Sequence, residues 1–150
     1  MKVAVASDHR GYLAKEQLKH FLEKAGHSVV DFGCDNATSC DYPDITIAGA
    51  ESVASGETDR GIFLCGTGIG TSIAANKVRS VRAALCHDEL TAGLSRRHNN
   101  ANVLCLPADL LGEELIRRVV DVWLNTDYEG GRHERRLKMI ADYEKNGKVE

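Results

Sequence analysis

The residues best suited to chemistry form the segment Cys-Gly-Thr-Gly-Ile-Gly at positions 65–70. Its glycines alternate, and a pattern typical of a helix follows. Alternating glycines allow consecutive backbone N–H groups to converge on one point, which makes an anion-binding loop at a helix N-terminus. A thiol at the beginning of this loop lies in a positive local field that favours its thiolate. Cys65 is therefore a candidate base or nucleophile, with a buried cysteine beside a tight turn as the alternative.

The same glycines could belong to a dinucleotide-binding fingerprint. This interpretation is weaker, because the spacing is GxGxG rather than GxGxxG and the segment follows the third predicted strand rather than the first. Asp88 does lie about twenty residues further on, as that fingerprint requires. The chain is too short, however, to hold a second mononucleotide-binding half.

Further polar clusters lie near the ends of other predicted strands. Residues 7–11 follow the first strand, residues 86–88 follow the fourth, and residues 97–100 precede the fifth. Because ligands of an open parallel sheet bind at the carboxyl ends of its strands, His9 and His98 are candidate site residues. The histidines in predicted helices and turns are expected to be solvated: His20, His27 and His133.

The cysteines and histidines show no metal-binding spacing. No set of His, Cys and Asp residues is spaced for a metal, so the sequence predicts no metal. The five cysteines are odd in number and include no CxxC pair, which argues against a disulfide scaffold or a structural zinc site. Cys86 and Cys105 lie within apolar runs and are expected in the core. Cys34 and Cys40 lie in a polar loop and are expected to be incidental.

Composition excludes several classes of function. The chain has 150 residues, 43% of them hydrophobic and 27% charged, so it can bury the core of one domain. A net charge of -3 disfavours general binding to nucleic acid. No apolar run approaches the roughly 18 residues of a membrane span, and no signal peptide is evident. We therefore expect a cytoplasmic protein with no membrane partner.

Short apolar runs alternate with helical patterns along the chain. The runs are continuous rather than alternating in polarity, as is typical of parallel strands covered on both faces. Strands are predicted at 3–6, 29–32, 62–65, 83–86 and 103–106, and helices at 14–25, 45–55, 70–77, 88–97 and 111–123. This order predicts an α/β fold with right-handed crossovers.

The segment after Asn125 differs in character from the rest. It turns at residues 130–131 and then has the pattern of a charged helix with a narrow apolar stripe. Such a helix can bury little on its own domain, so we expect residues from about 130 to 150 to pack against a partner subunit. Arg132 and Arg136 share one face of it, either as a solvated charged face or as a phosphate clamp.

Six motifs occur in order along nearly the whole chain. They are SDH with Gly11 (7–11), DYPD (41–44), CGTGIG (65–70), IAANKV (73–78), HNNANVL (98–104) and YEGGRHERR (128–136). Together they resemble the ribose-5-phosphate isomerase B family, which includes the galactose-6-phosphate isomerase subunits. The resemblance implies one domain of residues 1–150 with a three-layer α/β/α sandwich around a five-stranded, parallel, Rossmann-like sheet. It also implies a homodimer or homotetramer.

The resemblance implies a reaction as well. The family interconverts aldose and ketose phosphates without metal or cofactor, most simply ribose 5-phosphate and ribulose 5-phosphate. Cys65 would be the base that moves a proton between carbons 2 and 1, and Thr67 would assist it. His98 would help to open the furanose ring, and Asp8 would position the sugar oxygens. The amides that would hold the enediolate belong to the loop residues Gly66, Gly68, Ile69 and Gly70.

The substrate contacts implied by the resemblance come from several segments. His9 would hold the phosphate together with Arg132 and Arg136, and the two arginines would come from the neighbouring subunit. Tyr42 and Asn99 would line the sugar site. The sugar phosphate is thus expected to bind between two copies of the chain.

Two departures from the family pattern leave the substrate open. The family usually has Gly-x-Arg-x-x-Gly after the fifth strand, whereas residues 107–112 place Asp109 where that phosphate-binding arginine stands. Arg10 follows SDH, where the family usually has a small or apolar residue. We hypothesise that Arg10 supplies the missing cation to the phosphate; alternatively it pairs with an acid such as Asp35 or Asp109. Allose 6-phosphate, galactose 6-phosphate and a tetrose phosphate are alternative substrates, and a non-catalytic sugar-phosphate or nucleotide-binding module is a third interpretation.

Overall fold

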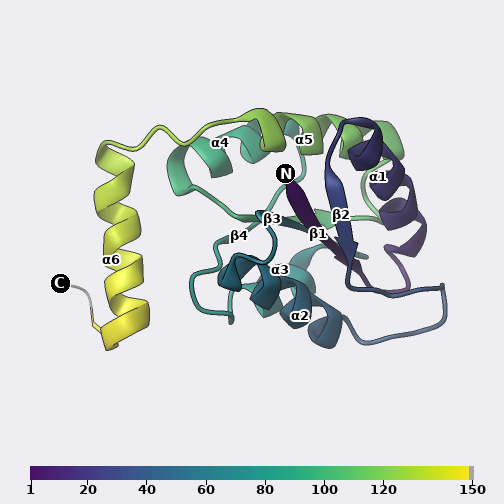
Figure 1. Cartoon of the computed structure of the whole chain (residues 1–150), viewed down its shortest axis with the longest axis horizontal. Coiled ribbons are helices and arrows are strands. Elements are labelled where there is room, and N and C mark those ends of the chain that lie inside the picture. The colour runs from purple at the N-terminus through teal and green to yellow at the C-terminus, as the bar shows by residue number, and fades with distance from the viewer. Residues whose placement is uncertain (149–150) are drawn as a thin grey trace.

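A five-stranded parallel sheet forms the centre of the molecule in the computed structural model, which describes residues 1–148 (Figure 1). The strands are β1 (Lys2–Ser7), β2 (Ser28–Asp31), β3 (Arg60–Cys65), β4 (Ala83–Leu85) and β5 (Val103–Pro107). The helices are α1 (Tyr12–Lys24), α2 (Tyr42–Ser55), α3 (Ile69–Ala75), α4 (Glu89–Asn99), α5 (Glu113–Asn125) and α6 (Arg132–Asn146). Within residues 1–148, no helix combines the length and the apolar character that crossing a lipid bilayer requires.

The strand order places the ends of β1 and β3 side by side. The order is β2-β1-β3-β5-β4, and every neighbouring pair is parallel. The chain runs from β1 outward to β2 and then returns to form β3 on the other side of β1. The carboxyl ends of β1 and β3 therefore meet at a topological switch point, where open α/β sheets bind ligands. Ser7 pairs with Leu64 and Cys65 with Pro107, so the segments after β1, β3 and β5 leave the sheet at one edge.

Helices cover both faces of the sheet and give three layers. Helices α2 and α3 lie on one face, and α1, α4 and α5 lie on the other (Figure 1). Val3 and Val5 of β1 pack on the side of α1 and α5, whereas Ala4 and Ala6 pack on the side of α2. Both faces of the strand are thus buried, which explains its continuous apolar run. The α/β sandwich expected from the sequence is confirmed.

The predicted helices are present, with some shifted ends. Helix α2 begins three residues before the predicted position 45, at Tyr42, because Pro43 fits the first turn, where no intrahelical N–H bond is made. Helix α5 begins at Glu113 rather than 111, with Gly112 before it. The Trp123 side chain on α5 is fully buried in the larger core. Truncating such a side chain typically costs about 3–5 kcal/mol.

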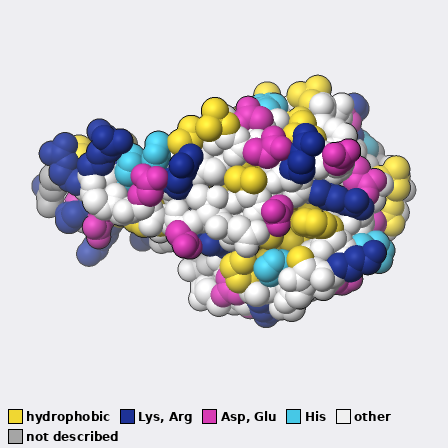
Figure 2. Space-filling model, turned by 90° about the horizontal axis from the view of Figure 1, so that it is seen from above, with side chains coloured by type: hydrophobic (Ala, Val, Ile, Leu, Met, Phe, Trp, Pro, Cys, Tyr) yellow, Lys and Arg dark blue, Asp and Glu magenta, His cyan; other side chains and the backbone are white. Residues whose placement is uncertain are grey.

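Helix α6 projects away from the sandwich (Figure 1). The predicted charged helix is confirmed, and Figure 2 shows Lys and Arg side chains gathered on the projection. Its far end is held where the Glu144 carboxylate accepts hydrogen bonds of 3.0 and 2.9 Å from the Ser80 N–H. Met139, Ile140 and Tyr143 nevertheless remain exposed. Within the described chain, α6 therefore carries an uncovered apolar strip.

Candidate active site

The Cys65 thiol lies at the carboxyl end of β3, inside the glycine loop. Cys65 is only 4% exposed, and its Sγ accepts a hydrogen bond of 3.1 Å from the Gly68 N–H. The Thr71 hydroxyl lies 3.6 Å from the same Sγ and donates to the Gly68 carbonyl oxygen at 3.1 Å. A hydrogen bond donated to sulfur is stronger when the sulfur is ionised. The Gly68 N–H therefore holds the sulfur in place at the beginning of the loop.

The backbone of the loop depends on Gly68. Its φ is 71°, in the left-handed region that side chains rarely adopt. A Cβ at this position would lie 2.5 Å from the Leu85 Cδ1 and 3.0 Å from the Leu106 carbonyl carbon. Only glycine allows the loop to pack this closely against β4 and β5, so the N–H that points at Cys65 is fixed by the fold.

The two threonines of the loop differ in position. Thr67 is exposed, and its Oγ1 accepts a hydrogen bond of 3.4 Å from the Ile69 N–H. Thr71 is fully buried beside the sulfur. Sequence reasoning did not include Thr71 among the site residues. A hydroxyl in the first turn of the helix that follows the loop was the available signal.

Asp8 lies beside this loop and organises the beginning of α1. The residue is buried, and its Oδ1 accepts hydrogen bonds from the N–H groups of Arg10 at 3.0 Å and Gly11 at 3.1 Å. Its own N–H donates to the Leu64 carbonyl oxygen at 3.3 Å, which ties the end of β1 to β3. A Cβ on Gly11 would lie 2.9 Å from the Cβ atoms of both Ser7 and Leu64, so this close approach requires glycine.

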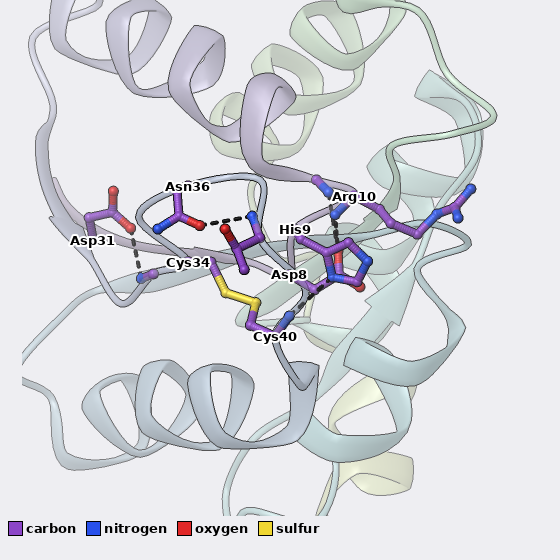
Figure 3. Close-up of a disulfide and its surroundings, with 10 residues drawn as sticks. Asp8, His9, Arg10, Asp31, Cys34, Asn36 and Cys40 are labelled. Carbon is purple, nitrogen blue, oxygen red and sulfur yellow. Dashed lines mark hydrogen bonds between the residues drawn. A yellow bond between two sulfur atoms is a disulfide. The ribbon is translucent and has the colours of Figure 1, made fainter.

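Tyr42 and His9 lie at the same edge of the sheet, Tyr42 at the beginning of α2 and His9 just after β1. The Tyr42 ring lies on Gly70, where an added Cβ would be 2.6 Å from the ring. The His9 Nδ1 accepts a hydrogen bond of 3.3 Å from the Cys40 N–H (Figure 3). The structure thus brings together four of the expected site segments, those of Asp8, His9, Tyr42 and the Cys65 loop.

Arg10 pairs with Asp109 directly over Gly66. The Arg10 Nε and Nη2 lie 2.6 and 2.5 Å from the Asp109 Oδ2. A Cβ on Gly66 would lie 2.6 Å from that oxygen and 2.8 Å from the Arg10 Nε. The hydrogen bond and charge of Asp109 raise the pKa of Arg10. The structure therefore shows the alternative pairing of Arg10 with Asp109, and a role of Arg10 in binding phosphate stays a prediction.

His98 belongs to a second group of side chains, near the beginning of α6. Its ring stacks on that of His133, with centroids 4.3 Å apart and an interplanar angle of 11°. The Glu129 Oε2 lies 3.9 Å from the His98 Nε2 and 3.8 Å from the His133 Nε2. Within residues 1–148, no hydrogen bond or ion pair joins this group directly to the Cys65 loop. Within one chain, the expected site residues therefore form two separate groups, one around Cys65 and one around His98.

The expectation that His133 is solvated was wrong. The residue is only 7% exposed, and its buried Nε2 has no hydrogen-bond partner in the described structure. Burial, followed by electrostatic interaction with His98, Arg132 and Arg136, lowers the pKa of His133. The stacking depends on how the chain turns before α6, a contact between distant positions that residue spacing does not reveal.

The other residues expected near the phosphate and sugar lie on this side. Arg132 and Arg136 are exposed on α6. Asn99 is exposed at the end of α4 and lines a groove of about 320 Å³ between α6 and the sandwich. Its carbonyl oxygen accepts a hydrogen bond of 3.2 Å from the Arg82 Nε. These residues therefore lie on the side of His98 and α6 rather than beside Cys65.

The His98 group also holds potential metal ligands. His98, Glu129 and His133 are the one set in the described part of the chain whose ligand atoms lie within 4.8 Å of one another. Sequence spacing gave no sign of this set, because His98 lies on α4, far along the chain from Glu129 and His133. The lone pair of an imidazole nitrogen lies in the plane of its ring. Two stacked, nearly parallel rings thus cannot both direct lone pairs at one ion unless a ring turns.

Cys34 and Cys40 form a disulfide (Figure 3), so the expectation that they are incidental was wrong. The polar loop folds back on itself and brings the two sulfurs together, a result that the cysteine count does not indicate. Cys86 and Cys105 are buried, as expected. Burial raises the pKa of both thiols.

Comparison with known proteins gives one consistent result. The sequence profile of the Ribose/Galactose Isomerase family matches residues 3–140. The chain is 43% identical over 143 residues to ribose-5-phosphate isomerase B of Escherichia coli, with 95% of this chain and 96% of that protein covered. It is 37% identical over 145 residues to D-erythrulose-4-phosphate isomerase of Pectobacterium atrosepticum, with 96% and 95% covered. A ribose-5-phosphate isomerase B structure from Clostridium thermocellum superposes with a TM-score of 0.96 at 48% identity, covering 98% of this chain and 99% of that one.

Proposed function

The chain belongs to the ribose/galactose isomerase family and is a sugar-phosphate isomerase, and within that class we propose that it interconverts ribose 5-phosphate and ribulose 5-phosphate with Cys65 as the base. The observation that carries this proposal is the Cys65 sulfur, which the Gly68 N–H and the Thr71 hydroxyl both approach. Moving a proton between two carbons next to a carbonyl needs a positioned base and donors for the developing oxyanion. One short loop supplies both.

The proton moves in two steps through an enediolate. Cys65 takes the proton from carbon 2 of the open-chain aldose and returns it to carbon 1, while the oxygen proton moves between the two oxygens. The Gly68 N–H already donates to the sulfur at 3.1 Å, so the amides of Gly66 and Gly70 hold the enediolate. The Ile69 N–H joins them if it leaves its 3.4 Å hydrogen bond to the Thr67 Oγ1. Thr67 is exposed beside them and assists at the substrate side. Losing one oxyanion donor typically costs about 3 kcal/mol of transition-state stabilisation.

The residues around this loop bind the sugar. Asp8 is fixed at one oxygen by two backbone N–H groups, so its carboxylate is held in place to orient sugar hydroxyls. Tyr42 covers Gly70 and closes the sugar pocket on that side. His9, anchored through Nδ1 by the Cys40 N–H, presents its other nitrogen to the phosphate.

The second half of the site comes from a second copy of the chain. Within residues 1–148, the His98 ring stacks on His133 and lies 3.9 Å from Glu129, and no hydrogen bond or ion pair joins it to the Cys65 loop. Helix α6 also exposes Met139, Ile140 and Tyr143, an apolar strip that a second copy would bury. In the homodimer, or in a tetramer of two dimers, α6 packs on the partner and carries Arg132 and Arg136 to its phosphate. His98 opens the furanose ring there, and Asn99 contacts the sugar.

A tetrose phosphate is the alternative substrate that a specific observation favours. Asp109 stands where the family pattern has a phosphate-binding arginine, and it pairs with Arg10 over Gly66. The chain also resembles, at 37% identity, a protein named for D-erythrulose 4-phosphate. Allose 6-phosphate and galactose 6-phosphate are further possibilities for the same chemistry.

A panel of sugar phosphates tests the proposal. The purified chain is assayed with ribose 5-phosphate, allose 6-phosphate, galactose 6-phosphate and erythrose 4-phosphate, and ketose formation is measured. We expect the highest kcat/KM with ribose 5-phosphate, no effect of EDTA, and loss of turnover in Cys65→Ala. A higher kcat/KM with another member of the panel would reassign the substrate. Turnover of Cys65→Ala at the wild-type rate would remove Cys65 as the base.

A further inference from the structure

The segment from Cys34 to Cys40 links two parts of the substrate-binding edge (Figure 3). It lies between β2 and α2 and is closed by the disulfide. At its end, the Cys40 N–H donates to the His9 Nδ1 at 3.3 Å. Two residues further on is Tyr42, whose ring lies on Gly70. The position of Cys40 therefore affects both His9 and Tyr42.

The beginning of the segment is fixed to the sheet. The Cys34 N–H donates to the Ser7 carbonyl oxygen at 2.5 Å, and the Ser7 N–H donates to the Gly33 carbonyl oxygen at 2.6 Å. Residues 35–39 in between are exposed. The disulfide is thus the short covalent connection between a point anchored on β1 and the backbone that holds His9.

The disulfide is also more accessible to solvent than the free cysteine thiols. Cys34 and Cys40 are partly exposed, whereas Cys65, Cys86 and Cys105 are buried free thiols. Burial raises the pKa of Cys86 and of Cys105, which keeps them protonated and poorly reactive. Exposed disulfides are the more easily reduced ones. A thiol reagent in solution therefore reaches the Cys34–Cys40 bond first.

We propose that Cys34 and Cys40 form a reversible redox site that controls how tightly the enzyme binds its sugar phosphate. The proposal rests on the roles proposed above for His9 and Tyr42. In the oxidised chain the closed segment holds both side chains at the site, and in the reduced chain it releases them. The predicted consequence is a change in KM with little change in kcat, because Cys65 and its hydrogen bonds lie on another loop.

The chemical step is thiol–disulfide exchange with a dithiol reductant. A thiolate of the reductant attacks one protein sulfur, and the other protein sulfur leaves as a thiolate and takes up a proton. The second thiol of the reductant then displaces the first protein sulfur, so the protein gains two thiols and the reductant becomes a disulfide. A low-molecular-weight disulfide such as oxidised glutathione reverses the exchange.

The test compares the wild-type enzyme in two verified redox states. It is prepared with dithiothreitol or with oxidised glutathione, the reagent is removed, and alkylation followed by mass spectrometry confirms the state of Cys34 and Cys40. We expect the KM for ribose 5-phosphate to be roughly two- to tenfold higher after reduction, the effect of losing about one hydrogen bond. The double variant Cys34→Ser/Cys40→Ser should show the higher KM in both preparations. Ser39→Ala, an exposed neighbour, should respond as the wild type does.

Amide hydrogen exchange provides a readout that does not depend on the substrate. Exchange across residues 34–42 should be faster in the reduced wild type than in the oxidised one, and independent of treatment in the double variant. Equal KM values and equal exchange in the two verified states would overturn the redox site. A KM difference between the two treatments that persisted in the double variant would overturn it too, because the response would then come from a residue other than Cys34 and Cys40. If no sugar phosphate is converted in either state, the proposed function fails, and the exchange measurement alone decides whether the redox site exists.

Discussion

The Tyr42 ring rests on Gly70, so closely that a single added carbon would lie 2.6 Å from the ring. This contact joins two segments that are distant in the sequence: the beginning of α2 and the glycine loop after β3. The contact also explains why the third glycine of the loop is needed although its φ is not positive: a side chain there would have no space beside the ring. The pocket wall and the proposed anion-binding loop therefore depend on each other.

Gly70→Ala should weaken substrate binding with little loss of stability. The new Cβ meets the ring of Tyr42, a partly exposed side chain that can move aside. We expect the KM for the sugar phosphate to rise roughly two- to tenfold, as if one substrate contact were lost. Gly112→Ala is the matched control, because nothing lies within 4 Å of a Cβ there. Steady-state kinetics and thermal unfolding of both variants measure the effect, and an unchanged KM in Gly70→Ala would contradict it.

Thr71→Val should reduce catalysis through the sulfur of Cys65. The substitution keeps the shape of the side chain but removes the hydroxyl 3.6 Å from the Sγ. We expect kcat to fall roughly tenfold, against about 10²- to 10⁴-fold for Cys65→Ala, which removes the base itself. The rate of Cys65 alkylation by iodoacetamide at fixed pH should also change in Thr71→Val. An exposed hydroxyl is removed in the control Thr67→Val, which should leave the alkylation rate as it is.

The pairing of Arg10 with Asp109 predicts a specific pattern of KM values. Arg10→Ala should raise the KM for ribose 5-phosphate only slightly, because the guanidinium is already bound to the carboxylate and its loss leaves one partly exposed negative charge, that of Asp109, unpaired over Gly66. Asp109→Ala should lower KM, since it removes a negative charge over Gly66 and releases a cation there. The double variant Arg10→Ala/Asp109→Ala should lose most of that gain. A large rise in KM for Arg10→Ala alone would instead show that Arg10 binds phosphate in spite of its partner.

Acid should destabilise the chain through His133. Burial, together with the nearby His98, Arg132 and Arg136, lowers the pKa of His133 from its usual 6.5. The unfolded imidazole returns to its ordinary pKa, so between the two values the unfolded state binds more protons and stability rises with pH. The contribution is complete above about pH 6.5 and is lost as the pH falls through the folded pKa.

Thermal unfolding as a function of pH measures this contribution. His133→Gln should show a smaller fall in Tm on acidification than the wild type. Some pH dependence should remain, because burial also lowers the pKa of His27. The control His20→Gln, whose side chain is 77% exposed, should follow the wild-type curve. Identical curves for His133→Gln and the wild type would show that His133 does not take part.

Local signals in the sequence were sufficient to predict the strands of the sheet and the edge that carries the glycine loop. Continuous apolar runs revealed strands buried on both faces, and alternating glycines placed a loop at the end of β3. Cys86 and Cys105 could be assigned to the core because each lies within such a run. Each of these inferences depends on neighbours within a few residues, where side-chain periodicity and backbone conformation are directly linked.

Contacts between distant segments could not be obtained in the same way. Arg10 and Asp109 are 99 positions apart, and the sequence alone left Arg10 with either a phosphate or an acid as partner. The stacking of His98 on His133 depends on the direction in which the chain turns before α6. The Cys34–Cys40 disulfide depends on how an irregular loop closes, for which no periodic pattern exists.

Mixing two inactive variants should restore activity if the site is shared between subunits. Cys65→Ala removes the base from one half of the proposed site, and Arg136→Ala removes a phosphate contact from the other. In a mixed dimer, one of the two sites receives both intact halves and the other receives both defects. Random exchange of subunits makes half of the dimers mixed, so about a quarter of all sites become complete.

The measurement is the activity of the two variants, first separate and then after exchange of their subunits. We expect the exchanged mixture to reach about a quarter of the wild-type rate, well above the mean of the separate variants. Cys65→Ala mixed with Thr71→Val serves as the control, because both changes lie in the same half of the site. Every site in that mixture carries one of the two changes, so no site can be more active than one of the Thr71→Val variant. Activity that remains at the mean of the separate variants would place Arg136 and Cys65 in one chain's site. Ile140→Glu on the exposed strip of α6 should abolish the recovery by blocking assembly, whereas Leu13→Glu, at a still more exposed position on α1, should not.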